Sequence, residues 1–127
     1  MLAEVPRPDF LGKEVFGPIL HIYRYRADEL ESIGRQLADT GYALTLGIHS
    51  RIDRFAEQVR DLVPAGNVYV NRSIIGAVVG VQPFGGEGLS GTGPKAGGPH
   101  ALLRYATERA VSVNITAQGG DPALLNL

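Results

Sequence analysis

The chain has 127 residues, 44% hydrophobic and 20% charged, which is the composition of a globular protein with one domain or one piece of a larger domain. Its 12 basic and 13 acidic residues give a net charge of -1 and form no run of one sign, so nucleic acid is not an expected partner. The N-terminus lacks the hydrophobic block of a signal peptide and no stretch has the roughly 18 to 20 apolar residues of a membrane helix, so we expect a cytoplasmic location.

The first predicted elements are a strand and a helix. Residues 1–12 hold two prolines and Gly12 without periodicity, which indicates an extended leading segment. The β-rich run 19–25 follows Gly17-Pro18 and predicts a strand. A helix of about three turns should follow, capped by Asp28 with Glu31 and ended by Gly41, because Leu30, Ile33 and Leu37 share one face.

The middle of the chain predicts strand, helix and strand. Residues 43–49 are mostly apolar, as in a strand covered on both faces. Ser50 and Asp53 should cap an amphipathic helix that Pro64 and Gly66 end. Residues 67–71 give a third strand. The alternation predicts the α/β class, with a mostly parallel sheet and helices on both faces.

The last third is dominated by glycine. Residues 76–98 hold more than half of the 17 glycines and predict no element, and loops of this length are usually functional or disordered. A short helix is expected over residues 100–107, and the strict alternation of residues 110–116 predicts a half-exposed strand. The residues after Gln118 should be loose or need a partner.

Several local patterns imitate functional motifs. Residues 86–91 read G-E-G-L-S-G, but Pro83 precedes them, Pro94 follows, and no acidic residue stands at the ribose position of a dinucleotide fold. Lys95 follows a proline and precedes no Ser or Thr, so it does not fit a phosphate-binding loop. Ser90 lies in no nucleophile elbow, and the three histidines lack metal-ligand spacing. We therefore assign no metal, and no chemical role to Ser90 or Lys95.

Two segments together carry a family resemblance. E-V-F-G-P at residues 14–18 and P-F-G-G-E-G-L-S-G at residues 83–91 resemble, in this order and separation, two segments of the aldehyde dehydrogenase superfamily. Residues 75–86 and 91–99 look like its 1-pyrroline-5-carboxylate dehydrogenase branch, and residues 113–120 look like the end of the bifunctional proline-utilisation (PutA) type. The resemblance implies that residues 13–116 are the C-terminal part of an aldehyde dehydrogenase catalytic domain, between the leading segment and a tail over 117–127.

The resemblance also implies a reaction. In the family a cysteine thiolate attacks the aldehyde, a hydride passes to NAD, and water releases the acid. This branch oxidises L-glutamate gamma-semialdehyde to L-glutamate in proline catabolism. The chain has no cysteine, and the family's nucleophile, general base and Rossmann part all precede the E-x-F-G-P segment. We therefore assign no catalytic residue and expect the chain to be inactive alone.

Five residues match family binding positions. Glu14 matches a glutamate whose oxygens accept from the nicotinamide ribose hydroxyls, and Phe16 matches an aromatic beside the nicotinamide. Gly76 and Ala77 match the anchor loop whose backbone amides hold the substrate carboxylate, and Phe84 matches an aromatic lining the path of the aldehyde. The choice between NAD and NADP stays open, because its determinant precedes these segments in the family.

Two other hypotheses remain. The chain could be a non-catalytic interaction or oligomerisation module that pairs through its terminal strand and tail. It could also bind nucleotide by itself, but Glu14 and Phe16 alone should hold a dinucleotide with millimolar affinity or weaker, about 4 kcal/mol or less. The enzyme hypothesis requires the preceding part of the dehydrogenase as partner and predicts a homo-oligomer when complete.

Overall fold

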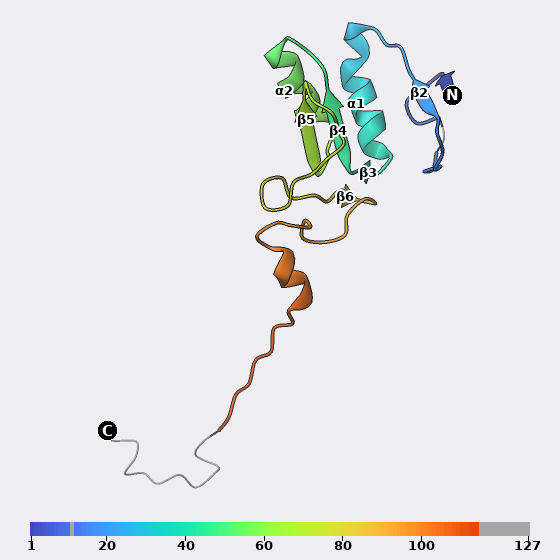
Figure 1. The fold of residues 1–127 in the computed structure, drawn as a ribbon. Coiled ribbons are helices and arrows are strands. Elements are labelled where there is room, and N and C mark those ends of the chain that lie inside the picture. Colours follow the sequence, from blue (N-terminus) through green and yellow to red (C-terminus); the bar gives the residue numbers. More distant parts are fainter. Residues whose placement is uncertain (11, 115–127) are drawn as a thin grey trace, which may run out of the picture.

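The computed structural model describes residues 1–10 and 12–114. The helices α1 and α2 and the strands β4 and β5 form a central unit, with a ribbon of β1 and β2 at the N-terminal side and an extended segment leaving toward the C-terminus (Figure 1). The buried hydrophobic residues lie in the central unit, just before β4 and directly after β1: Ile33, Ile48, Ala56, Tyr69, Ala43 and Val5.

The N-terminal ribbon pairs two segments that are distant in sequence. Strand β1 (Leu2–Glu4) lies parallel to β2 (Leu20–Ile22), with Leu2 opposite Leu20. The predicted strand over residues 19–25 is therefore shorter than expected, and the predicted leading segment contains a strand. Arg24 and Glu4 support the pair with an exposed ion pair of 3.3 Å.

The central unit is a parallel strand pair joined by a helix. Strand β4 (Thr45–Ile48), helix α2 (Asp53–Leu62) and strand β5 (Asn67–Val70) follow one another, and Thr45 pairs with Asn67 in register. The predicted sequence of strand, helix and strand is confirmed here. The side chain of Asn71 joins the strand ends, because its amide oxygen accepts from Ser50 N at 2.9 Å and its amide nitrogen donates to Ser50 O at 2.8 Å.

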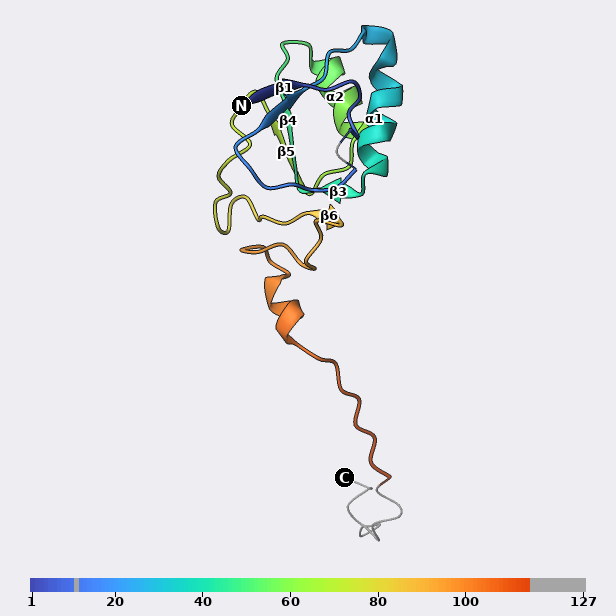
Figure 2. The same cartoon turned by 90° about the vertical axis from the view of Figure 1, so that its right-hand side faces the viewer.

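Helix α1 (Leu30–Asp39) packs against α2, as both ribbon views show (Figures 1 and 2). Gly34 permits the contact, since an added Cβ would lie 2.9 Å from the Leu62 Cβ. Leu30, Ile33 and Leu37 line an apolar cavity of about 130 Å³ with Leu46, Val59 and Leu62, which confirms the predicted helix face. Gly41 follows the helix with φ of 75°, as predicted for a left-handed stop.

The predicted caps of both helices are wrong. Asp28 and Glu31 are in ion pairs with Arg26 and Arg35, at 3.0 and 3.2 Å. A 3-10 turn, η1 (Ala27–Glu29), precedes α1, and the Glu29 carboxylate accepts from Arg26 N at 2.7 Å.

The start of α2 differs from the prediction as well. The Ser50 hydroxyl accepts from Ile52 N at 3.0 Å and makes no cap hydrogen bond to the helix. Both differences arise because neighbouring polar groups compete for the same side-chain oxygens.

The predicted strand over residues 43–49 is divided at Leu44. Strand β3 (Tyr42–Ala43) pairs antiparallel with β6 (Glu87–Gly88), whereas β4 pairs with β5. The glycine-rich segment, predicted to lack elements, therefore contributes β6 and the isolated bridges of Phe84 with Ala96 and Gly86 with Gly91. The G-E-G-L-S-G motif forms this strand and a turn, so it does not open a helix.

The C-terminal part extends away from the central unit (Figure 1). The predicted helix over 100–107 is a 3-10 helix, η2 (Ala101–Tyr105). The predicted strand over 110–116 does not form in residues 110–114, and its last two residues lie outside the described ranges. The predicted tail over 117–127, and most of the segment 113–120 that resembles the proline-utilisation type, also lie outside the described residues.

The predicted α/β class, with parallel strands and helices, is confirmed. The described strands form three two-stranded sheets, β1 with β2, β3 with β6 and β4 with β5. Within residues 1–10 and 12–114, no helix has the length and apolar character needed to cross a membrane.

Candidate cofactor and substrate sites

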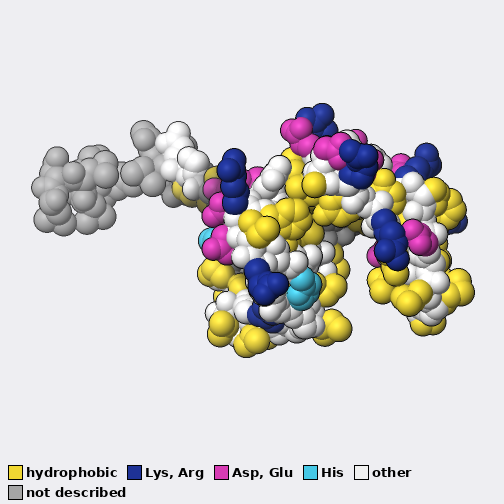
Figure 3. Space-filling view, turned by 90° about the horizontal axis from the view of Figure 1, so that it is seen from above, with side chains coloured by type: hydrophobic (Ala, Val, Ile, Leu, Met, Phe, Trp, Pro, Cys, Tyr) yellow, Lys and Arg dark blue, Asp and Glu magenta, His cyan; other side chains and the backbone are white. Residues whose placement is uncertain are grey.

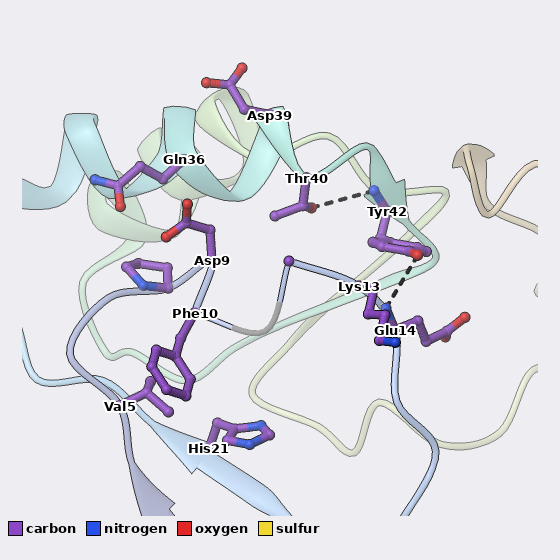
Figure 4. Close-up of a pocket in the computed structure, with 12 residues that line it drawn as sticks. Val5, Asp9, Phe10, Lys13, Glu14, His21, Gln36, Asp39, Thr40 and Tyr42 are labelled. Carbon is purple, nitrogen blue, oxygen red and sulfur yellow. Dashed lines mark hydrogen bonds between the residues drawn. The ribbon is translucent and has the colours of Figure 1, made fainter.

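Glu14 lies at a pocket between the N-terminal ribbon and the end of α1 (Figure 4). The pocket has a volume of about 430 Å³, and its lining combines apolar and charged residues: Val5, Pro8, Asp9, Phe10, Gly12, Lys13, Glu14, His21, Gln36, Asp39, Thr40 and Tyr42. The Glu14 N–H donates to the Tyr42 hydroxyl at 3.3 Å, which ties the segment before β2 to β3. The Glu14 carboxylate points away from Asp9 and Phe10, so it is free to accept from a ligand outside the pocket interior.

The pocket does not have the character of a metal site. Its lining includes Lys13 along with the carboxylates of Asp9, Glu14 and Asp39, and Asp9 pairs with Arg7 at 3.1 Å. Among the residues that the structure describes, no group of three or more His, Cys, Asp or Glu could hold a metal ion.

Phe16 is one of the most exposed large hydrophobic residues in the described part of the chain. The residue is 90% exposed and does not line the Glu14 pocket. It belongs to a group of exposed hydrophobic residues on the N-terminal segment, at the right of the space-filling view (Figure 3): Met1, Leu2, Val15, Phe16, Ile19 and Leu20. An exposed ring of this kind can pack against a flat ligand or against another protein surface.

Gly76 and Ala77 lie in an exposed loop that follows β5. Gly76 has φ of 98°, a conformation that L side chains rarely adopt, so glycine is required there. The Arg72 guanidinium donates to Gly76 O at 3.3 Å and stacks over the Tyr69 ring at 4.7 Å. This side chain connects the buried ring of β5 to the start of the loop.

Phe84 lies where the loop returns to the central unit. Its backbone N and O both bond to Ala96, at 3.0 and 2.8 Å, and the residue is 36% exposed. Gly80 N donates to Gly97 O at 3.0 Å. Residue 80 is therefore bonded to residue 97 and residue 84 to residue 96, so both lie along the segment 96–97. The structure thus connects the predicted substrate loop to Phe84 through that segment.

The two predicted sites are separate in this chain. The pocket lined by Glu14 includes none of Gly76, Ala77 and Phe84.

Sequence reasoning missed Asn67, Arg72 and Lys95, whose side chains bond to the backbone of the substrate loop and of the Phe84 segment. The one available signal was Lys95 itself, a long cationic side chain within a run of glycines.

Comparison with known proteins identifies what the chain resembles. Residues 2–111 match the pattern of the family described as "Aldehyde dehydrogenase family". The chain is 53% identical to "Bifunctional protein PutA" of Klebsiella aerogenes over 126 residues, 97% of this chain and 10% of the relative. It is 36% identical to the mitochondrial "Delta-1-pyrroline-5-carboxylate dehydrogenase" of Homo sapiens over 110 residues, 84% of this chain and 19% of the relative.

Solved structures give the same result. A crystal structure of Bradyrhizobium japonicum "Proline Utilization A" matches with a TM-score of 0.80 and 60% identity, over 93% of this chain and 12% of that one. A Thermus thermophilus 1-pyrroline-5-carboxylate dehydrogenase matches with a TM-score of 0.65 and 39% identity, over 76% and 19%. The chain therefore spans about a tenth of the PutA proteins and about a fifth of the dehydrogenases that it matches.

Proposed function

Because this chain belongs to the aldehyde dehydrogenase family, we propose that it is the C-terminal part of a 1-pyrroline-5-carboxylate dehydrogenase catalytic domain that oxidises L-glutamate gamma-semialdehyde to L-glutamate. The 53% identity over 97% of the chain to a PutA protein carries the proposal. In this proposal the chain contributes to proline catabolism in the cytoplasm, is inactive alone, and forms a homo-oligomer when the preceding part is present.

The proposed cofactor is NAD, and the residues present fit part of it. Glu14 offers an exposed carboxylate, an acceptor-only group suited to the two hydroxyls of a ribose. Phe16 offers an open aromatic face for a flat ring. NAD would supply the acceptor for the hydride that leaves the aldehyde carbon. The contribution of Glu14 and Phe16 is to orient it, because both match cofactor-binding positions of the family and neither matches its nucleophile or its general base.

The proposed substrate site is the loop around Gly76 and Ala77. A carboxylate needs hydrogen-bond donors without steric cover, and the backbone of a glycine at φ of 98° followed by alanine meets this requirement. A simple alkyl aldehyde has no carboxylate for this loop to bind. Phe84 would line the path of the aldehyde, close to the loop along the segment 96–97.

A hybrid protein tests the proposal directly. This chain would replace the matching stretch of Bradyrhizobium japonicum Proline Utilization A, and oxidation of glutamate semialdehyde would be followed with NAD and with NADP. The same protein truncated before that stretch is the matched control. Activity of the hybrid above that of the truncated protein supports the proposal, and an inactive but folded hybrid refutes it.

The alternative function is a non-catalytic interaction module. It is favoured by the exposed hydrophobic residues of the C-terminal part: Leu102, Leu103, Tyr105, Val111 and Val113. A module of this kind would associate with a preceding dehydrogenase part, or with itself, without restoring turnover. Sedimentation of the 127-residue chain, alone and with that part, separates association from activity.

A further inference from the structure

The side chain of Asn67 holds the backbone on both sides of Phe84. Its amide nitrogen donates to Pro83 O at 3.0 Å, and its amide oxygen accepts from Gly85 N at 3.2 Å. The residue is the first of β5, so these two bonds attach the segment to a strand of the central unit. With the two bonds between Phe84 and Ala96, the polar groups from Pro83 O to Gly85 N are all satisfied.

Lys95 precedes Ala96, the partner of Phe84, and adds further bonds to the same attachment. Its ammonium has three N–H donors, and three oxygens receive them: Gly66 O, Gly85 O at 2.8 Å and Asn67 Oδ1 at 3.2 Å. The group is partly buried, and within the described ranges no carboxylate pairs with it. The ammonium therefore holds together three neutral oxygens, two from the backbone and one from a side-chain amide.

The backbone around this ammonium is closely packed. A Cβ added to Gly66 would lie 1.9 Å from Gly85 O, so the turn before β5 and the loop after Phe84 meet at van der Waals distance. An arginine could not repeat the arrangement, because its planar guanidinium directs its donors in a fixed fork.

We propose that Lys95 and Asn67 are positioning residues that fix the Phe84 backbone, so that the phenyl ring is presented in one orientation. They act through Phe84 and do not touch the reacting atoms. A catalytic benefit of fixing Phe84 rests on the proposed function, because an aromatic ring that lines the path of an aldehyde must be held in place to orient that aldehyde. The attachment itself is a property of the chain and can be measured without turnover.

Chemical labelling tests the Lys95 contacts in the unmodified chain. Lys13 and Lys95 are the two lysines of the sequence, and Lys13 is exposed, so one amine-acetylating reagent compares them within one molecule. We expect Lys95 to react about tenfold more slowly than Lys13, as its donors are engaged in charge-assisted hydrogen bonds. Equal rates in a chain whose β4 and β5 amides resist hydrogen exchange would overturn the proposal.

Tryptophan fluorescence tests the consequence for residue 84. The sequence contains no tryptophan, so Phe84→Trp gives a single reporter, placed also in Lys95→Met and in the control Lys13→Met. We expect Lys95→Met to increase the fast, local component of the anisotropy decay. Lys95→Arg should show the same increase, whereas Lys13→Met should leave this component unchanged.

Asn67→Asp provides a second variant, since it removes the donor to Pro83 O while keeping an oxygen for Lys95. Protection of the β4 and β5 amides shows that each variant is folded. Equal mobility of residue 84 in Lys95→Met, Asn67→Asp and Lys13→Met would overturn the proposal. Neither measurement needs dehydrogenase activity, so an inactive but folded hybrid protein would refute the proposed function without affecting this test.

Discussion

Gly66→Ala should disconnect the Phe84 segment from the central unit. The new Cβ would lie 1.9 Å from Gly85 O and 2.7 Å from the Gly86 Cα, whereas a carbon and a carbonyl oxygen need about 3.3 Å or more. Both obstructing atoms belong to the backbone, so no side-chain rotation relieves the clash. The loop must move, and the Gly85 hydrogen bonds with Asn67 and Lys95 must lengthen or break.

The expected destabilisation follows from these contacts. Overpacking of a well-filled site costs about 1 to 3 kcal/mol, and the hydrogen bonds of Gly85 that would break are worth about 1 kcal/mol each. Urea unfolding of the 127-residue chain, followed by circular dichroism, should show a loss in this range. Gly17→Ala is the control, because an added Cβ there meets no atom within 4 Å. A Gly66→Ala variant as stable as Gly17→Ala would refute the packing described here.

Three predictions concern the hybrid protein and are tested by initial rates at varied NAD and varied aldehyde. Glu14→Gln should raise the KM for NAD about tenfold, since one charge-assisted hydrogen bond is weakened, and an unchanged KM would remove Glu14 from the cofactor site. Gly76→Ala should raise the KM for glutamate semialdehyde but not for NAD, because φ of 98° is strained for alanine. Arg72→Lys should raise the KM for glutamate semialdehyde by a smaller factor, because lysine loses the stack on Tyr69 and bonds more weakly to Gly76 O. Equal increases in the KM for NAD and the KM for the aldehyde would argue against a local role of Arg72.

The parts of the fold that could be predicted from sequence are those determined by local patterns. The apolar face of α2 and the proline and glycine after it give that helix, and the apolar runs before and after it give β4 and β5. The strands β1 and β6 could not be predicted, because each is two or three residues long and exists only through a partner far away in sequence. The caps failed for a different reason: Asp28 and Glu31 each have an arginine close by that takes the carboxylate.

The candidate sites divide in the same way. Glu14, Phe16, Gly76, Ala77 and Phe84 were identified because they belong to stretches with a family pattern, residues 14–18 and 75–86. The bonds of Asn67 and Lys95 span 10 to 29 residues along the chain, so no local spacing reveals them. Their role is visible only when the loop after β5 has been folded back onto the strand.

The candidate residues also differ in how far this chain fixes them by itself. Phe84 is 36% exposed and its backbone N and O are both hydrogen-bonded. In contrast, Phe16 is 90% exposed, and Ile75 and Val79 beside the anchor loop are 82% and 84% exposed. Large apolar side chains left in water gain about 1.5 to 3 kcal/mol each when they are buried. Under the proposed function, the preceding part of the dehydrogenase supplies that cover. Hydrogen exchange should therefore slow over residues 75–79 when that part is added, while Phe84 N–H stays as protected as before. Equal slowing at both places would mean that the Phe84 segment is not preformed in this chain.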